Sequence, residues 1–315
     1  MLDRRKRTSQ AVTTIVMLVG LLTGCEAKSG EVPAPAPVTN PGSSMYPSKI
    51  AFTDNGGPSG PSVYVMNSDG TAVKRIAAGY EPDFAPDGSK IVIRQSWSGL
   101  LVMNPDGSNP VQLVDRGAYP EFAADGTRIV FACHRRICVV DADGTNLKTL
   151  TQSMGGERLN YPQFPTFSPD GSRIAFTLNS TLWLMNADGT DLRILLEDAI
   201  APVFTPDGSG IVFASGRGGH DRIETYLMDA DGRNIRPLTG EGTALPSPDP
   251  YHSTTLPAFS PDGTHLLVTR STQNSAKVVT GSEIWVMNPD GSDPRRLTEP
   301  NQPATAASWG GNSSS

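Results

Sequence analysis

Short runs of β-branched, aromatic and aliphatic residues recur along the chain from about residue 48 onward, each followed by a polar turn. Residues 129–131 (Ile-Val-Phe) and 182–185 (Leu-Trp-Leu-Met) are examples of such runs. Asp-Gly pairs stand between the runs and favour tight turns, because glycine accepts a positive φ. No segment keeps a helical period, so the pattern predicts an all-β domain built from many short strands.

Two phrases alternate along this domain. The first, Pro-x-Phe-x-x-Asp-Gly, occurs five times, at 82–88, 120–126, 165–171, 202–208 and 257–263. The second is a strand signal ending in Met-Asn-x-Asp-Gly or a near variant, and it occurs six times, at 63–70, 101–107, 138–144, 182–189, 226–232 and 284–291. The core repeat is about 37 residues. Four strand signals per repeat predict the blade of a β-propeller, and six repeats predict six blades.

The first repeat lacks its opening phrase, and the missing copy stands at the other end of the chain. Residues 307–312 (Ala-Ser-Trp-Gly-Gly-Asn) fit the phrase, with Trp309 in the Phe position and Asn312 in the Asp position. We therefore expect the C-terminal strand to complete the first blade and close the ring, which removes exposed sheet edges. The predicted domain is a six-bladed β-propeller at 48–312, with four antiparallel strands per blade.

The N-terminal segment carries the features of an export signal. Residues 4–7 are basic, 11–22 are mostly apolar, and small residues follow. Residues 22–25 (Leu-Thr-Gly-Cys) resemble the lipobox of bacterial lipoproteins, which predicts a signal peptide at 1–24 and lipidation of Cys25. The alternative is a cleaved signal with an incidental cysteine. Lipidation implies a membrane-anchored protein on the extracytoplasmic side, in the periplasm or at the cell surface.

Residues 25–47 are rich in Pro, Ala, Gly and Ser and contain few apolar side chains. Such a segment cannot bury enough surface to fold, so we expect a semi-extended tether. The formal net charge of the chain is −6, and the only basic run lies at the N-terminus. Nucleic acid is therefore not an expected partner.

The phrases at 167–171 and 259–263 (Phe-Ser-Pro-Asp-Gly), each followed by a Met-Asn-x-Asp-Gly-type phrase, resemble the repeat of TolB-like propellers. The resemblance covers 48–312. It implies a TolB-like propeller fold, which occurs in envelope scaffolds, in the propellers of some peptidases and in sugar-active proteins. TolB itself has an α/β domain before its propeller, and here only the tether precedes it.

The sequence contains no Gly-x-Ser-x-Gly pentapeptide, the nucleophile motif that a propeller-bearing serine peptidase requires. Asp141 and Asp143, like the second pair Asp229 and Asp231, resemble part of a calcium loop. The positions two residues before each pair are apolar, so these aspartates are interpreted as turn formers. The recurrent aromatic and methionine positions of the second phrase are interpreted as core. No catalytic residue, metal site or cofactor is predicted.

An alternative function starts from two histidines in the later insertions. His220 and His252 flank the fifth and sixth blades and could reach one rim. A metal site there would make the protein a sugar-active, lyase-type enzyme. The preferred hypothesis is a non-enzymatic, monomeric envelope lipoprotein that binds a protein, peptide or glycan.

Two further hypotheses concern named side chains. Cys133 and Cys138 flank a tight turn between two adjacent strands, where opposed residues come within bridging distance, so a disulfide is predicted. The alternative is a pair of buried free thiols. The x position of the Pro-x-Phe phrase is expected to face the axial channel, where Asp83 and Glu121, together with Glu81 on the same face, would form an acidic arc that binds a cationic group. The alternative is that backbone N–H groups or solvent satisfy these carboxylates.

Overall fold

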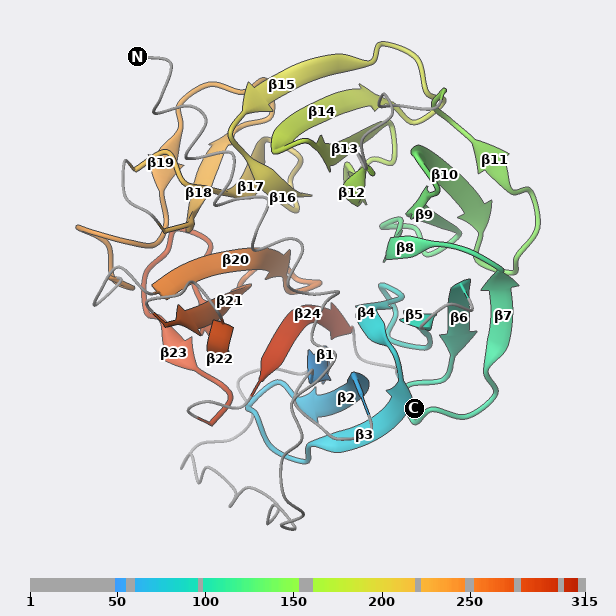
Figure 1. The fold of residues 1–315 in the computed structure, drawn as a ribbon, viewed down its shortest axis with the longest axis horizontal. Helices are drawn as coiled ribbons and strands as arrows, with labels where there is room; N and C mark the ends of the chain where they lie inside the picture. The colour runs from blue at the N-terminus through green and yellow to red at the C-terminus, as the bar shows by residue number, and fades with distance from the viewer. Residues whose placement is uncertain are drawn as a thin grey trace.

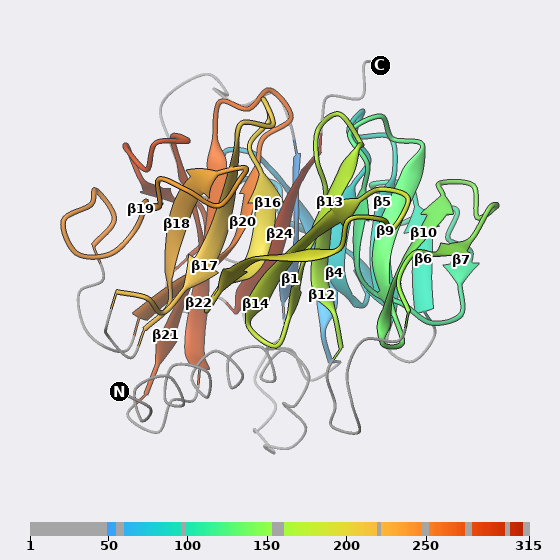
Figure 2. The ribbon, with the colours of Figure 1, turned by 90° about the horizontal axis from the view of Figure 1, so that it is seen from above.

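The structure is a computed structural model that describes residues 49–54, 60–95, 99–152, 161–218, 222–246, 252–274, 279–299 and 303–310. Six four-stranded antiparallel sheets stand in a ring around a central axis (Figure 1). Seen from the side, the blades are upright and the innermost strands run roughly along the axis (Figure 2). The predicted six-bladed β-propeller is confirmed.

Each blade is a sheet whose strands follow one another in chain order from the axis outward, apart from the strand that closes the ring. Blade 1 holds, from the innermost strand to the outermost, β24 (Ala304–Gly310), β1 (Lys49–Asp54), β2 (Ser62–Asn67) and β3 (Lys74–Ala78). Blade 2 holds β4 (Tyr80–Phe84), β5 (Ile91–Gln95), β6 (Gly99–Met103) and β7 (Val111–Val114). Blade 3 holds β8 (Ala118–Phe122), β9 (Arg128–Cys133), β10 (Arg136–Asp141) and β11 (Lys148–Thr149).

The later blades follow the same order. Blade 4 holds β12 (Gln163–Phe167), β13 (Arg173–Leu178), β14 (Thr181–Asn186) and β15 (Arg193–Glu197). Blade 5 holds β16 (Ile200–Phe204), β17 (Gly210–Ser215), β18 (Glu224–Asp229) and β19 (Arg236–Pro237). Blade 6 holds β20 (His252–Phe259), β21 (Leu266–Gln273), β22 (Val279–Met287) and β23 (Arg295–Arg296).

Strand β24 closes the ring, as the sequence predicted. It pairs antiparallel with β1, with Trp309 opposite Ile50 and Gly310 opposite Lys49. Trp309 is 5 % exposed and packs in an apolar cluster with residues of blade 6. The first and last parts of the described chain therefore share one blade.

The core lies between neighbouring blades. One cluster joins Val92 and Leu100 of blade 2 to Phe131 and Val140 of blade 3. The recurrent methionines of the second phrase are also buried, which confirms their interpretation as core residues: Met66, Met103, Met185, Met228 and Met287. Because each apolar face is covered by the next sheet, the blades can be short and still bury their side chains.

The two ends of the ring differ. At one end, which we call the turn face, Asp-Gly turns join the strands, and the aspartate side chain accepts the backbone N–H two residues later, as Asp143 does from Thr145 at 2.9 Å. Asp141 and Asp229 accept from the side-chain amides of asparagines 146 and 234, so the aspartates that resemble a calcium loop shape turns. At the other end, which we call the loop face, the innermost strands begin and the insertions occur.

Glycine is required in the second phrase. Gly189 has φ +91°, and a Cβ there would overlap the backbone carbonyl oxygen of Leu150 in the preceding blade. A side chain would therefore clash with fixed backbone as well as strain the turn. None of the described residues belongs to a helix long and apolar enough to cross a membrane.

Candidate functional site at the axial channel

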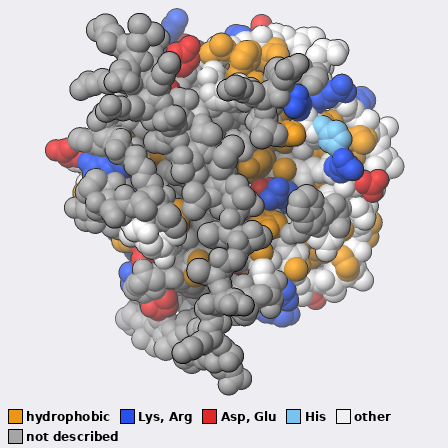
Figure 3. All heavy atoms as spheres, viewed as in Figure 1, with side chains coloured by type: hydrophobic (Ala, Val, Ile, Leu, Met, Phe, Trp, Pro, Cys, Tyr) orange, Lys and Arg blue, Asp and Glu red, His pale blue; other side chains and the backbone are white. Residues whose placement is uncertain are grey.

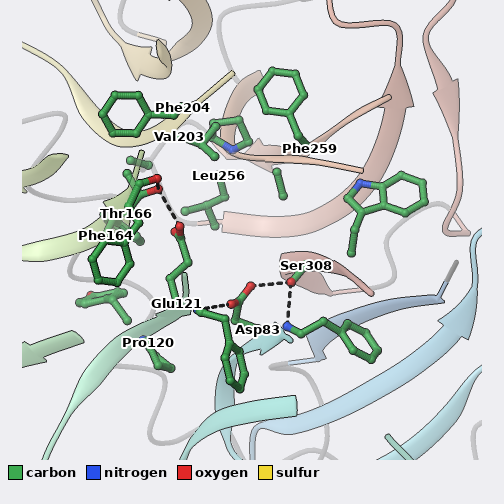
Figure 4. Close-up of a pocket in the computed structure, with 18 of the residues that line it drawn as sticks. Asp83, Pro120, Glu121, Phe164, Thr166, Val203, Phe204, Leu256, Phe259 and Ser308 are labelled. Atoms are coloured by element: carbon green, nitrogen blue, oxygen red, sulfur yellow. Dashed lines mark hydrogen bonds between the residues drawn. The ribbon is translucent and has the colours of Figure 1, made fainter. Parts of the chain in front are cut away.

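A cavity of about 450 Å³ lies on the axis and is lined by the innermost strands of all six blades. Figure 4 shows side chains from these strands converging on it. The x positions of the Pro-x-Phe phrase all contribute, as the sequence predicted: Asp83, Glu121, Thr166, Val203, Ala258 and Ser308.

A ring of β-bulges surrounds the loop-face end of this cavity. In every innermost strand the residue two positions before the x position is not a glycine, yet it has a φ between +50° and +54°: Glu81, Tyr119, Phe164, Ala201, Leu256 and Ala306. Each is accompanied by a register shift against the neighbouring strand. Positive φ is uncommon for such residues and is often found at functional sites.

These bulges correct one step of the sequence analysis. Simple alternation along a strand was expected to place Glu81 and Asp83 on one face, but the bulge interrupts the alternation between them. Glu81 still borders the cavity. Its Oε2 accepts the backbone N–H of Tyr119 in the next blade at 2.7 Å and lies 3.3 Å from Nε of Arg94 in its own blade.

The carboxylate of Asp83 links three blades. Its Oδ1 accepts from Ser308 Oγ of blade 1 at 2.6 Å, and its Oδ2 accepts from the backbone N–H of Phe122 of blade 3 at 2.7 Å. Ser308 Oγ in turn accepts the backbone N–H of Phe84 at 3.1 Å. Figure 4 shows this chain of hydrogen bonds along one side of the channel.

Glu121 makes the corresponding link from blade 3 to blade 4. Its Oε1 accepts from Thr166 Oγ1 at 2.7 Å. Asp83 and Glu121 therefore lie where the sequence placed them, but their oxygens are engaged by protein donors. For Asp83 this matches the alternative in which backbone N–H groups satisfy the carboxylate, and ligand binding by the pair stays a prediction.

Burial changes the proton affinity of these groups. Loss of solvation raises the pKa of Asp83 to about 6, against the opposing effect of its hydrogen bonds from Ser308 and the backbone. Burial, and next the charge of Asp83, raise the pKa of Glu121. The pKa of Glu81 is also raised by burial, although Arg94 opposes the shift. One side of the channel thus holds three carboxyl groups whose pKa values burial raises.

The opposite side of the channel is apolar. Blades 5 and 6 contribute Val203 and Ala258 at the x positions and Ala201 and Leu256 at the bulges. Figure 4 shows Val203 and Leu256 facing the carboxylate side. The channel can therefore hold a group with a cationic or hydrogen-bonding edge and an apolar edge.

The two histidines of the metal-rim hypothesis fall at or beyond the limits of the described chain. His220 lies outside the described residues, and of His252 only the backbone at the start of β20 is described. Within the part of the chain that the structure describes, no three His, Cys, Asp or Glu side chains are arranged to hold a metal ion.

Cys133 and Cys138 form a disulfide, with their Cα atoms 5.8 Å apart. The expected geometry is wrong in one respect, because the two residues are not directly opposed. The ladder pairs Cys133 with Arg136 and Cys138 with Phe131. The cysteines are diagonal neighbours on one face of the β9–β10 hairpin, still within the range that a disulfide spans.

The fold is similar to that of TolB structures. TolB from Acinetobacter baumannii has a TM-score of 0.65 and 17% identity, and the match covers 83% of this chain and 66% of that one, just under two thirds. A putative TolB from Agrobacterium tumefaciens has a TM-score of 0.60 and 16% identity over 84% of this chain and 93% of that one. The match confirms the predicted TolB-like propeller fold.

Another similar structure belongs to an enzyme. Oligogalacturonate lyase from Vibrio parahaemolyticus has a TM-score of 0.51 and 14% identity, with 76% of this chain and 71% of that chain covered. No protein-family model matches the sequence, and no curated protein matches it. These likenesses establish the fold, and function has to be argued from the site.

Proposed function

We propose that this chain is a non-enzymatic, lipid-anchored envelope protein whose propeller is a scaffold that binds a partner at the axial channel. The observation that carries the proposal is the channel itself, a cavity of about 450 Å³ with carboxyl groups on one side and apolar side chains on the other. A site of this kind fixes a ligand by shape and a few polar groups. The TolB-like fold is consistent with such a role.

The chemistry of the channel favours a partner that inserts a cationic or hydrogen-bond-donating group beside Asp83 and Glu121. A positive charge there would stabilise the ionised carboxylates, whose pKa values burial raises. The partner is a protein, peptide or glycan of the envelope. No cofactor is part of the proposal.

The experiment compares capture of partners from detergent-solubilised envelopes by the parent and by Val203→Trp, which fills the apolar side of the channel. Val111→Trp is the matched control, because Val111 lies on β7 and is 62 % exposed. We expect Val203→Trp to lose a partner that the control retains. Equal capture by both folded variants would refute binding in the channel.

The lipid anchor is tested separately. A Cys25→Ala variant is expected to accumulate as precursor or as soluble protein in the extracytoplasmic fraction, because the predicted tether offers no other apolar anchor. Fractionation and metabolic labelling with a fatty acid measure this. A variant that remains membrane-bound like the parent would contradict the lipoprotein hypothesis.

The alternative is a lyase-type enzyme with a metal site near His220 and His252, the class to which one structural neighbour belongs. Metal analysis after native purification separates the two functions. A stoichiometric transition metal that is lost in His252→Ala would favour the enzyme over the scaffold.

A further inference from the structure

A second candidate site lies on the loop face beside the channel, over blades 2 to 4. Two adjoining cavities of about 730 and 680 Å³ share Arg116, His134 and Tyr161 in their walls. We call them together the loop-face pocket. Tyr119 lines both this pocket and the channel, so the two sites are neighbours, but their chemistry differs.

The loop-face pocket is basic. Its walls carry four arginines and a histidine: Arg94, Arg116, Arg135, Arg136 and His134. No aspartate or glutamate is among the described residues that line it, but Glu81, which borders the channel, lies 3.3 Å from Arg94 and offsets the charge of that arginine. Figure 3 shows Lys and Arg side chains around a histidine on this face, over the region of β9 and β10. Because the whole chain has a net charge of −6, this positive cluster is a local feature that attracts anions.

The backbone that carries these side chains is closely held. The disulfide between Cys133 and Cys138 braces the hairpin that presents His134, Arg135 and Arg136. Gly99 at the start of β6 lies so close to the segment leading to Arg116 that a Cβ would overlap the carbonyl oxygen of Val114. The backbone beneath these arginines is therefore fixed, and a ligand would have to order only their side chains.

Aromatic rings and an amide stand among the positive groups. Tyr161 is 46 % exposed, and the Arg135 guanidinium lies 5.9 Å from its ring. Tyr119 packs 4.4 Å from the Phe164 ring, and its hydroxyl accepts a hydrogen bond from Gln163 Nε2 at 3.0 Å. The pocket thus combines flat apolar faces, hydrogen-bonding edges and guanidinium groups.

We propose that the loop-face pocket binds an acidic saccharide, a sugar chain whose rings bear carboxylates. Arg116 and Arg136 are exposed and present guanidinium forks, which suit carboxylates. The exposed ring of Tyr161 would cover the apolar face of a sugar, and Gln163 would meet its hydroxyl edge. An acidic peptide shares the charge but lacks the rigid rings that these tyrosine faces fit. The proposal does not depend on the partner of the channel.

The test uses the full chain in calorimetric titrations with three probes. A trimer of mannuronate carries three carboxylates, acetylated and amidated triglutamate carries the same number on a peptide, and a neutral mannose trimer carries none. We expect the mannuronate trimer to bind at least tenfold more tightly than triglutamate and the neutral trimer not to bind. Comparable binding of triglutamate would overturn the saccharide assignment, and so would failure of the mannuronate trimer to bind.

Variants locate the site. Arg116→Gln and Arg136→Gln are each expected to weaken mannuronate binding about tenfold, the usual effect of losing a charge-assisted hydrogen bond. Tyr161→Ala is expected to weaken it less. Arg233→Gln is the matched control, because this side chain is 80 % exposed and pairs with Asp231 on the turn face. Unchanged binding in the Arg116 and Arg136 variants, or an equal loss in the control, would refute the location.

Discussion

Around the axis, blades 1 to 4 are joined by polar x-position side chains that bond to the neighbouring blade, whereas blades 5 and 6 meet through apolar ones. Ser308 and Asp83 each accept a backbone N–H from the following innermost strand, and Glu121 accepts from the side-chain hydroxyl of Thr166 on the strand that follows it. Val203 and Ala258 hold the same positions in blades 5 and 6 and have no acceptor atom. The same position of the repeat therefore makes hydrogen bonds between blades 1 to 4, which we call the polar half, and apolar contacts in blades 5 and 6, which we call the apolar half.

The difference follows from the position of the innermost strands. Each pairs with a neighbour on one edge only. Backbone N–H groups such as those of Phe84 and Phe122 therefore donate to the preceding blade. In the polar half, a side chain satisfies these donors at the expense of burying a carboxylate. In the apolar half, Val203 and Ala258 offer no such acceptor, and the x positions add only hydrophobic contact. The hydrogen bonds between blades 5 and 6 lie elsewhere, as between the Thr254 N–H and the Ile223 carbonyl oxygen at 2.7 Å.

The largest expected effect comes from removing the strand where the two halves meet. Strand β24 supplies Ser308 to the polar half and places Trp309 in the apolar cluster with blade 6. Deletion of 304–315 should abolish cooperative folding or cause aggregation, because β1 would become an exposed edge. Thermal unfolding followed by circular dichroism measures this. Deletion of 311–315 alone is the control, and equal stability of both truncated chains would refute the closure role of β24.

A smaller effect is expected from single substitutions in each half. Asp83→Ala should lower the free energy of unfolding by about 2 kcal/mol, because Phe122 N–H and the Ser308 hydroxyl lose their acceptor. Val203→Ala should cost about 0.5–1 kcal/mol, because it removes only partly buried methyl groups. Urea denaturation compares the two, with Asp83→Asn as the conservative variant. A larger loss for Val203→Ala would contradict the distinction between the halves.

The double substitution Asp83→Lys with Glu121→Lys would reverse the charge of the acidic arc, but it would also break these hydrogen bonds. Its effect on partner binding would therefore be mixed with a loss of stability. Asp83→Asn with Glu121→Gln is the better variant, because it removes the charge and keeps one oxygen acceptor at each position.

The polar half also predicts a pH dependence. Because burial raises the pKa of Asp83 to about 6 and that of Glu121 in the same direction, the folded state holds protons that the unfolded state has released. The contribution of Asp83 to stability is thus greatest below the unfolded pKa of about 4 and is lost as the pH rises through about 6. The contribution of Glu121 is lost as the pH rises through its own raised pKa. The aspartates of the turns have lowered pKa values, about 2 for Asp170. Their protonation therefore changes the stability only at a lower pH than that of Asp83.

His265 has a lowered pKa, caused mainly by burial, and opposes the effect of the carboxyl groups as the pH falls. The measurement is therefore the difference in urea midpoint between the parent and the Asp83→Asn, Glu121→Gln variant. We expect the parent to gain stability relative to the variant between pH 7.5 and 5. A difference that does not change with pH would show that the two carboxyl groups do not titrate in this range.

The repeat made the blades, their number and the ring closure predictable, because Pro-x-Phe and Met-Asn-x-Asp-Gly recur with the strands that they join. It also placed Asp83 and Glu121 at the channel. The bulge at Glu81 was missed, since ideal alternation contains no positive φ at a non-glycine residue. The loop-face pocket was missed because Arg116, His134 and Tyr161 come from three separate segments, and no local spacing links them.

The smallest predicted effect extends the polar half into blade 5. By analogy with Phe84 and Phe122, the backbone N–H of Phe259 is expected to point toward Val203. Val203→Thr keeps the shape of the side chain and adds an acceptor there, so stability should rise by about 0.5–1 kcal/mol. The matched control is Val212→Thr, where the hydroxyl would enter an apolar cluster at a wholly buried position and should cost about 1–3 kcal/mol. Opposite signs for the same substitution in adjacent strands, measured by urea denaturation, would support the role of the x position as a hydrogen-bond link between blades. A loss at Val203 as large as that at Val212 would refute it.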